Sequence, residues 1–187
     1  GGAEVLLFDP EAPWEKPCGG GIPRHALEHF PELASLGGRG RWVRRVRVVA
    51  PEAGELAVEL PAPLLLVERR ALGDYQLGRA RAAGAQHVAR RVVEVARGPG
   101  GVGFRVVDDA GAAYDVAAVI GADGAASLVR RRLAAALRPR ATPARGRFVP
   151  VADGAESELV VVFGRGLAGY VWEFPRGETS SVGVCSL

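Results

Sequence analysis

The chain has 187 residues, of which 48% are hydrophobic and 24% charged, and its formal net charge at pH 7 is +3. A chain this apolar and this weakly charged can bury enough surface to fold, which excludes an intrinsically disordered protein. It contains no methionine and begins Gly1-Gly2-Ala3, so we expect the sequence to begin inside a longer protein. No apolar run approaches the ~18 residues that a membrane-spanning helix needs.

All basic residues except Lys16 are arginines, and they are scattered along the chain in short clusters such as Arg130-Arg131-Arg132. A nucleic-acid-binding protein concentrates basic residues on one face, among aromatic side chains. Aromatic residues make up only 6% of this chain, so the sequence predicts no nucleic-acid partner. Cys18 and Cys185 stand far apart, which indicates free thiols and the reducing cytoplasm. The three histidines show no metal-ligand spacing, and we predict no metal site.

The first half of the chain alternates predicted strands with predicted helices. Residues 4–9 form a short apolar run that ends in Asp9, as in a buried parallel strand. Glycines end both predicted helices, residues 24–36 and 70–84. Alternating or continuous apolar runs predict the strands between these helices, at residues 41–50, 55–60 and 64–67.

The second half contains one predicted helix and is otherwise rich in strands. The helix is predicted by an alanine- and leucine-rich run at 125–137, which Pro139 ends. Strands are predicted at residues 87–96, 104–108, 113–120, 147–152, 158–163, 170–174 and 181–185. The fold class is therefore α/β with α+β elements. The proline- and arginine-rich stretch 138–147 places a domain boundary near residue 140.

Two segments match the pattern G-x-G-x-x-G, which binds dinucleotide phosphates when it lies between a strand and a helix. They begin at Gly98 and Gly164, and strand-like residues instead of a helix follow both. We therefore predict a hairpin turn at the first and a strand connection at the second. Asp9 is different, because an acid that ends the second strand of a Rossmann unit binds ribose hydroxyls. Taken alone, Asp9 is better explained as an ordinary strand-ending residue.

Three further motifs occur in a fixed order: Lys-Pro-Cys-Gly-Gly-Gly at 16–21, Gly-Ala-Asp-Gly at 121–124, and Tyr-Val-Trp-Glu-Phe-Pro at 170–175. Together they resemble the geranylgeranyl reductase family of FAD-dependent oxidoreductases, within the p-hydroxybenzoate-hydroxylase-like flavoproteins. The first and third motifs are fairly specific for that family, and the second is shared by the superfamily. The resemblance covers nearly the whole chain. It implies an incomplete Rossmann-like FAD-binding domain at 1–140 and the start of an antiparallel β-sheet substrate domain at 141–187. The strands at 41–67 are the part of the first domain that could instead belong to the substrate-side sheet.

The resemblance also implies roles for individual residues. Asp9 would hold the ribose of the FAD adenosine, Arg69 would lie on the phosphate side of FAD, and Cys18 would lie in the loop that passes the flavin. The implied cofactor-binding residues are Asp9, Cys18, Gly19, Gly21, Arg69, Val92 (or Val93, since the register is uncertain by one), Asp123 and Gly124.

The third motif implies a substrate site. Tyr170, Trp172 and Phe174 alternate along one predicted strand, so their side chains share a face that could line a hydrophobic cavity for an isoprenoid chain. The same alternation is also typical of an ordinary hydrophobic core. Cys18 is the candidate catalytic residue, or it merely shapes its loop.

The implied function is reduction of carbon–carbon double bonds in a geranylgeranyl or other prenyl chain by hydride transfer from reduced FAD, with NAD(P)H or another reductant as electron donor. The substrate would be a prenyl lipid, which makes peripheral membrane contact of a cytoplasmic enzyme plausible. The family's first glycine motif and its later Gly-Asp-Ala-Ala-Gly-type segment are absent from the sequence. We therefore expect a fragment that lacks part of the FAD site and is inactive alone. The alternatives are an FAD-dependent monooxygenase or a flavin-dependent halogenase of the same fold and, from another class, a non-catalytic β-rich binding module.

Overall fold

The computed structural model describes residues 2–139, 141–151, 158–164 and 166–186. The chain divides into two units, each built from two segments. Unit 1 comprises Gly1–Ala12 and Leu77–Ala141, and unit 2 comprises Pro13–Gln76 and Thr142–Leu187. In this division, residues 13–76 belong to the same unit as the C-terminal strands, and the chain passes from unit 1 to unit 2 between Ala141 and Thr142.

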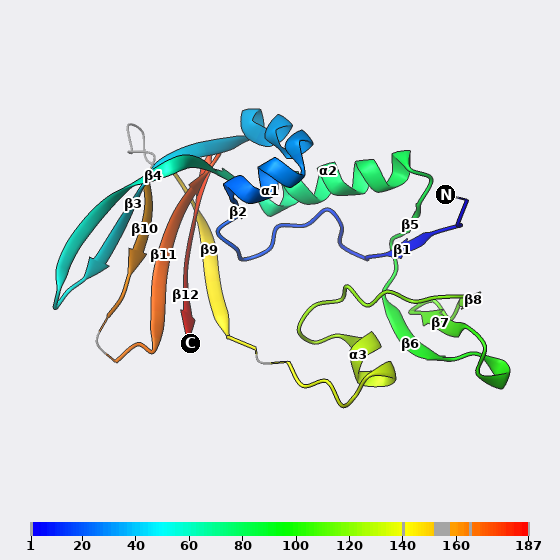
Figure 1. The fold of residues 1–187 in the computed structure, drawn as a ribbon. Helices are drawn as coiled ribbons and strands as arrows, with labels where there is room; N and C mark the ends of the chain where they lie inside the picture. The colour runs from blue at the N-terminus through cyan, green and yellow to red at the C-terminus, as the bar shows by residue number, and fades with distance from the viewer. Residues whose placement is uncertain (1, 140, 152–157, 165, 187) are drawn as a thin grey trace. The chain divides into compact units, whose positions relative to one another are not determined.

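Unit 2 is built on one seven-stranded sheet with the order β2-β4-β3-β10-β11-β12-β9 (Figure 1). Its strands are β2 (Gly21–Ile22), β3 (Gly40–Ala50), β4 (Gly54–Val67), β9 (Ala144–Pro150), β10 (Glu158–Val162), β11 (Gly169–Arg176) and β12 (Thr179–Ser186). All neighbouring strands are antiparallel except β3 and β10, which are parallel. The sheet is thus mixed at one pair, where β10 lies parallel to β3, the edge strand of the β3–β4 hairpin. The predicted strand end at Ala152 lies outside the described residues.

Strand β4 is longer than the sequence predicts. Pro61 and Pro63 indicate a break between two short strands, but one strand runs through both prolines. The ladder between β3 and β4 shifts register between Val43 and Arg45, so the proline-containing stretch lies beside an irregularity where ladder hydrogen bonds are not needed.

The helical part of unit 2 covers one end of the sheet. It consists of α1 (Arg24–His29), a 3₁₀ segment (Pro31–Arg39) and the beginning of α2 (Arg69–Ala82). The helix predicted at 24–36 therefore ends early, and Pro31 marks the change because it has no N–H to continue the α-helical ladder. Ile22, Leu36, Leu65 and Val67 form the buried core beneath these elements. The helix predicted at 70–84 is confirmed as α2.

Unit 1 contains two small sheets. Strands β1 (Leu6–Phe8) and β5 (Gln86–Val88) form a parallel pair, and an antiparallel sheet has the order β6-β7-β8. The three antiparallel strands are β6 (Val92–Arg97), β7 (Phe104–Asp108) and β8 (Ala113–Val116). The Gly98 motif forms the turn between β6 and β7, and the Gly164 motif connects β10 to β11 in unit 2. Both predictions for these glycine motifs are confirmed.

Two predicted elements of unit 1 are shorter than expected. The strand predicted at 113–120 ends at Val116, where its pairing with β7 ends, and Ile120 is 91% exposed. The helix predicted at 125–137 is reduced to α3 (Leu128–Leu133). Asp123 and Ser127 accept hydrogen bonds from the first helical N–H groups, which fixes the start of α3. The residues beyond Leu133 lack the packing that a short helix needs.

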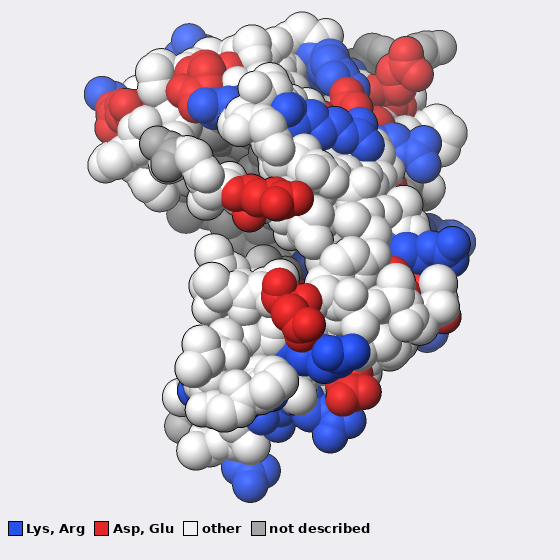
Figure 2. Space-filling view, turned by 90° about the vertical axis from the view of Figure 1, so that its right-hand side faces the viewer, with Lys and Arg blue, Asp and Glu red and all other residues white. Residues whose placement is uncertain are grey.

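Charged side chains of both signs lie interspersed on the face shown in Figure 2. Among the described residues of that face, neither the basic nor the acidic side chains form a continuous patch. None of the described helices is long and apolar enough to cross a bilayer.

Candidate functional site

The glycine loop at 16–21 packs tightly inside unit 2. A Cβ atom at Gly19 would overlap the ring of Phe174, and one at Gly20 would overlap the Val67 carbonyl oxygen. Gly20 also has φ +76°, a conformation that L side chains rarely adopt. Gly21 has ordinary space around it and opens β2. The loop therefore needs glycine at 19 and 20, and the predicted set included Gly19 and Gly21 but missed Gly20.

Cys18 and Arg69, predicted separately, lie together. The Cys18 Sγ atom accepts hydrogen bonds from Arg69 Nη1 at 3.6 Å and from the Gly20 amide at 3.5 Å. The thiol is partly exposed. The Nε atom of Arg69 is buried and has no hydrogen-bond partner among the described residues. The arrangement leaves a guanidinium N–H beside the loop that could donate to a further group.

Glu15 and Arg176 complete this cluster, and the sequence reasoning missed both. Arg176 is fully buried, and its Nη1 donates to Glu15 Oε1 at 2.7 Å and to the Cys18 carbonyl at 3.3 Å. Glu15 also accepts from the backbone amides of Arg69 and Arg70, at 3.1 and 2.9 Å. One carboxylate thus ties the start of α2 to β11. The available signal was position, since Glu15 directly precedes one motif and Arg176 directly follows another.

The three aromatic residues of β11 share one face of the sheet of unit 2. The ring centroids of Tyr170 and Trp172 are 6.3 Å apart, and Phe174 packs against the buried residues of the same face. Trp172 is only 6% exposed, and its indole N–H donates to Ser181 Oγ at 3.1 Å. Its ring covers Gly183, where a Cβ would overlap it. Trp172 is therefore a fixed, flat part of this face.

The same face continues across the neighbouring strands. The register places a row of apolar side chains on the side of Trp172 and Phe174, at Val46, Val48, Leu56, Val58, Leu159 and Val161. The opposite face carries ion pairs, including Arg47 Nε to Glu158 Oε1 at 2.6 Å and Arg45 Nε to Glu59 Oε1 at 2.9 Å. The carboxylate of Glu158, through its hydrogen bond and its charge, raises the pKa of Arg47. The sheet thus has one apolar and one charged face, and we name the first the aromatic face.

Tyr170 lies on the aromatic face near the start of β11. It is paired across the ladder with Cys185 and packs against Phe163, whose ring centroid is 6.0 Å away. The hydrogen bond with Cys185, together with burial, raises the pKa of the Tyr170 phenol. The phenol therefore stays protonated at neutral pH.

In unit 1, Asp9 lies directly after β1. Its Oδ1 atom accepts from the amides of Glu11 and Ala12, at 2.9 and 3.0 Å. Among the described residues, no hydrogen bond reaches Oδ2. An Asx turn therefore fixes the carboxylate and leaves one oxygen open to accept from a ligand.

The remaining predicted residues of unit 1 occupy separate places. Val92 opens β6, and the β6–β7 ladder is irregular directly after it. Asp123 Oδ2 accepts from the amides of Leu128 and Val129, at 2.6 and 3.2 Å. Burial acts to raise the pKa of Asp123, but its hydrogen bonds outweigh this effect and lower the pKa. Gly124 has φ +76° and open space around it. Asp123 serves α3 as a cap, and its carboxylate also has a hydrogen bond with the Ser127 side chain.

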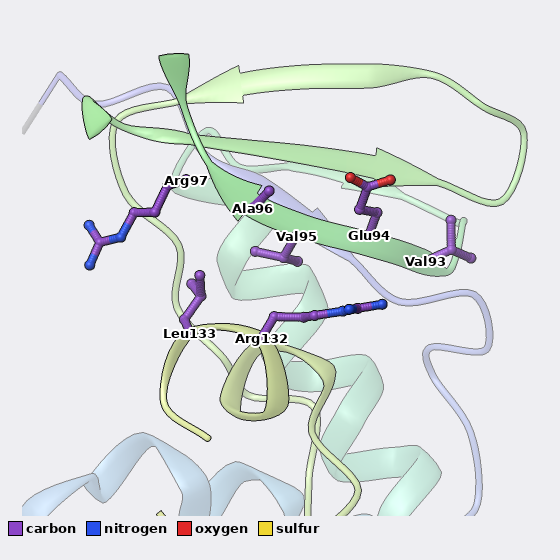
Figure 3. Close-up of a pocket in the computed structure, with 7 residues that line it drawn as sticks. All are labelled: Val93, Glu94, Val95, Ala96, Arg97, Arg132 and Leu133. Carbon is purple, nitrogen blue, oxygen red and sulfur yellow. The ribbon is translucent and has the colours of Figure 1, made fainter. Parts of the chain in front are cut away.

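A pocket of about 410 Å³ lies between β6 and α3, within unit 1. Val93, Val95 and Arg97 line it from β6, and Arg132 and Leu133 line it from α3. Figure 3 shows the long Arg132 side chain running along β6. The pocket contains none of the predicted substrate residues, but Val93, the alternative to Val92 in the predicted cofactor-binding set, lines it.

Comparisons with known proteins identify solved structures with a similar fold. No protein-family model matches the chain, and no curated protein matches its sequence. Solved structures do match. A probable FAD-dependent monooxygenase, PqsL, from Pseudomonas aeruginosa has 20% identity and a TM-score of 0.69, covering 99% of this chain and 54% of PqsL. A geranylgeranyl bacteriochlorophyll reductase-like protein from Thermoplasma acidophilum has 22% identity and a TM-score of 0.72, covering 98% and 50%. The flavin-dependent brominase Bmp2 has 16% identity and a TM-score of 0.68, covering 99% and 50%.

The chain shares the fold of these solved structures, among them a probable FAD-dependent monooxygenase and a flavin-dependent brominase. It spans about half the length of the solved structures that it matches. This flavoprotein fold supports a partial Rossmann-like unit together with a β-sheet unit, as the sequence predicts. At these sequence identities, the structural similarity shows the fold alone. It does not indicate which reaction this protein performs.

The residues present are compatible with FAD in each unit taken by itself. In unit 1, the open Asp9 Oδ2 suits a ribose hydroxyl, which is a hydrogen-bond donor. In unit 2, the unpartnered Arg69 Nε suits an anionic or carbonyl oxygen. The glycines at 19 and 20 allow the backbone of the loop to approach a planar group closely.

Proposed function

We propose that the protein is an FAD-dependent oxidoreductase that reduces carbon–carbon double bonds in a prenyl chain. The observation that carries this proposal is the contact between Gly19 and Phe174. This contact joins the two motifs that are most specific for the resemblance, the glycine loop at 16–21 and the aromatic strand at 170–175. Both motifs belong to unit 2, and the contact places the loop predicted to pass the flavin against the aromatic face.

The aromatic face suits an apolar, unbranched or methyl-branched substrate. Its side chains are almost all hydrocarbon, and the Trp172 indole N–H and the Ser181 hydroxyl satisfy each other. Few polar groups on this face are thus left to orient a polar substrate. We propose that this face excludes water and aligns the prenyl chain by burial of apolar surface.

The residues proposed to bind FAD are given for each unit by itself. Asp9 would hold the adenosine ribose, with Val92, Asp123 and Gly124 contributing elsewhere in unit 1. In unit 2, Arg69 would donate to a phosphate oxygen, and Cys18, Gly19 and Gly21 would lie along the flavin. FAD supplies the hydride chemistry when bound, and NAD(P)H or another reductant would recharge it. Because the substrate is a lipid, we also propose peripheral membrane contact.

The second candidate is a monooxygenase or halogenase on the same fold. It is favoured by the neighbours PqsL, a probable FAD-dependent monooxygenase, and Bmp2, a flavin-dependent brominase. In such an enzyme the aromatic face would hold a planar aromatic substrate, and FAD would supply the oxygen chemistry when bound.

One experiment separates these candidates. The complete gene product is reduced and incubated without oxygen with a geranylgeranyl lipid. The mass of the lipid after the reaction is then measured by mass spectrometry. We expect mass increments of two hydrogens, and we expect Trp172→Ala to reduce their rate about tenfold or more. Trp42→Ala is the matched control, since Trp42 is a 41% exposed tryptophan of the same unit outside the aromatic face. Substrate-stimulated oxygen consumption with no saturation of the lipid would favour the second candidate.

A further inference from the structure

The side chain of His87 links the end of β1 to the last turns of α2, inside unit 1. Its Nε2 atom lies 2.9 Å from the Asp9 carbonyl oxygen, and its Nδ1 atom lies 3.0 Å from Arg81 Nη2. His87 is paired with Leu7 in the parallel β1–β5 ladder. The imidazole thus lies at the strand end where Asp9 begins its turn.

The two partners of His87 determine its protonation state. A carbonyl oxygen can only accept a hydrogen bond, so Nε2 must carry a proton and donate to Asp9. A guanidinium can only donate, so Nδ1 must be unprotonated and accept from Arg81. Both contacts exist together only in the neutral Nε2–H tautomer. Protonation of Nδ1 would replace a hydrogen bond with two facing cations.

Asp9 is held on every side except one. Its amide donates to the Val88 carbonyl at 3.2 Å, its carbonyl accepts from His87, and its Oδ1 accepts from two amides of the following turn. Only Oδ2 is left without a hydrogen bond among the described residues. The direction of this oxygen therefore depends on the backbone of Asp9, which His87 helps to fix.

We propose that His87 is a positioning residue for Asp9, and that its protonation weakens binding of the adenosine end of FAD. This inference rests on the proposed function. The neutral imidazole fixes the Asp9 carbonyl and hence the direction of Oδ2 toward a ribose hydroxyl. A protonated imidazole loses Arg81, and the turn at Asp9 loosens with it.

The other charged groups near His87 are carboxylates and guanidinia. Arg81 faces it from α2 and Asp9 from β1, and next to them Glu11 pairs with Arg91 at 3.6 Å. Glu4 accepts from the neutral side chain of Gln86. Carboxylates and guanidinia ordinarily titrate well outside this interval, whereas histidine titrates within it. A pH response in this range therefore reports on histidine.

The test measures FAD affinity of the complete gene product by fluorescence titration at pH 7.5 and 5.5. We expect affinity to fall about threefold to tenfold at the lower pH, the size of one or two neutral hydrogen bonds. His87→Gln is the decisive variant, because its amide offers one donor and one acceptor and does not titrate. It should keep the affinity at pH 7.5 within about twofold and lose the pH response. His25 is an exposed histidine on α1, and the control variant His25→Gln should keep both the affinity at pH 7.5 and the pH response.

Nitrogen NMR of the unliganded protein gives a second readout. We expect the His87 ring to be the Nε2–H tautomer at pH 7.5, and the amides of Glu11 and Ala12 to shift with its titration. If the wild type binds FAD but His87→Gln keeps the wild-type pH response, His87 is not a positioning residue and the proposed function stands. The same holds if neither affinity nor those amides respond to pH. If the wild type binds no FAD at any pH, the proposed function fails and this inference fails with it.

Discussion

In unit 2, every strand from β4 to β12 in the sheet order has a hydrogen-bonded neighbour on both sides, whereas the strands of unit 1 form two separate sheets of two and three strands. Most of the buried apolar residues of the described chain belong to unit 2, among them Val43, Leu65 and Leu66. In unit 1 the buried set includes Val95 and Val106. Unit 2 is therefore held mainly by apolar packing and a continuous ladder.

Unit 1 depends more on local polar contacts. Asp108 is buried and accepts from the amides of Ala110 and Ala112 and from the Tyr114 hydroxyl, at 2.9, 2.9 and 3.1 Å. Asp9 and Asp123 fix a turn and a helix start in the same way. Burial acts to raise the pKa of Asp108, but these hydrogen bonds outweigh it and lower the pKa. The comparison teaches that the substrate-side unit owes its shape to packing, and the unit with the predicted ribose site owes it to carboxylates that cap backbone amides.

The largest effect is expected from the core of unit 2. Leu66 is fully buried beneath the aromatic face, so Leu66→Ala should lower the free energy of unfolding by about 3 kcal/mol through lost burial and the cavity left behind. Leu56→Ala, at a side chain 61% exposed on the same strand, should cost less than about 1 kcal/mol. Tryptophan fluorescence reports this unfolding selectively, because Trp14, Trp42 and Trp172 all belong to unit 2. Equal losses for the two variants would contradict a packing-dominated unit.

The polar exception within unit 2 is the Glu15–Arg176 pair. Arg176→Met removes the buried guanidinium that neutralises Glu15 and should lower the free energy of unfolding by about 2–3 kcal/mol. Arg147→Met, at an exposed arginine of β9, should change it by less than about 0.5 kcal/mol.

A double variant sharpens this prediction. Glu15→Gln removes the charge that Arg176→Met leaves unpaired, so the two changes together should cost clearly less than the sum of the single losses. Denaturant titration followed by tryptophan fluorescence measures all four states. Strict additivity would mean that the two residues do not act as a pair.

In unit 1 a smaller effect is expected from a cap. Asp123→Asn weakens the hydrogen bonds to the start of α3 and should lower the free energy of local opening of α3 by about 1 kcal/mol, measured by amide exchange of its residues. Asp109→Asn is the matched control, an exposed aspartate of the same unit. No difference between these variants would mean that α3 is held by its contact with β6 alone.

The smallest expected effect is the pH dependence of this cap. The pKa of Asp123 is lowered in the folded protein, so its contribution is present above the ordinary carboxyl pKa of about 4 and is lost as pH falls through the lower, folded pKa. The difference between wild type and Asp123→Asn should therefore shrink as the solution is acidified below about pH 4. Amide exchange across that range measures it, and a difference that grows in acid would reverse the assigned sign.

The sequence predicted the elements whose pattern is strong and local. The helix at 70–84 and the strands of the C-terminal region have clear periodicity and clear stops, and the structure contains them. The sequence-based prediction was wrong where the extent of an element depends on contacts with other parts of the chain. The apolar run at 117–120 has no strand beside it among the described residues, and the helix at 125–137 is set by two caps instead of by its composition.

The site was predicted residue by residue and not as an arrangement. The motifs indicated Cys18, Arg69 and Phe174 separately, but the fold was needed to show that they lie around one loop. Glu15 and Arg176 stand 161 residues apart, and each lies next to a motif without belonging to it, so their contact is what identifies them as a pair. Likewise, the role of His87 depends on two partners that sequence spacing does not reveal.

The most direct test of the central claim is the absorbance spectrum of the purified, complete gene product, before and after removal of bound small molecules. The account predicts the two bands of oxidised flavin, their recovery on addition of FAD, and weaker recovery for Asp9→Ala than for Asp115→Ala, an exposed aspartate of the same unit. A colourless protein that takes up no FAD would contradict it.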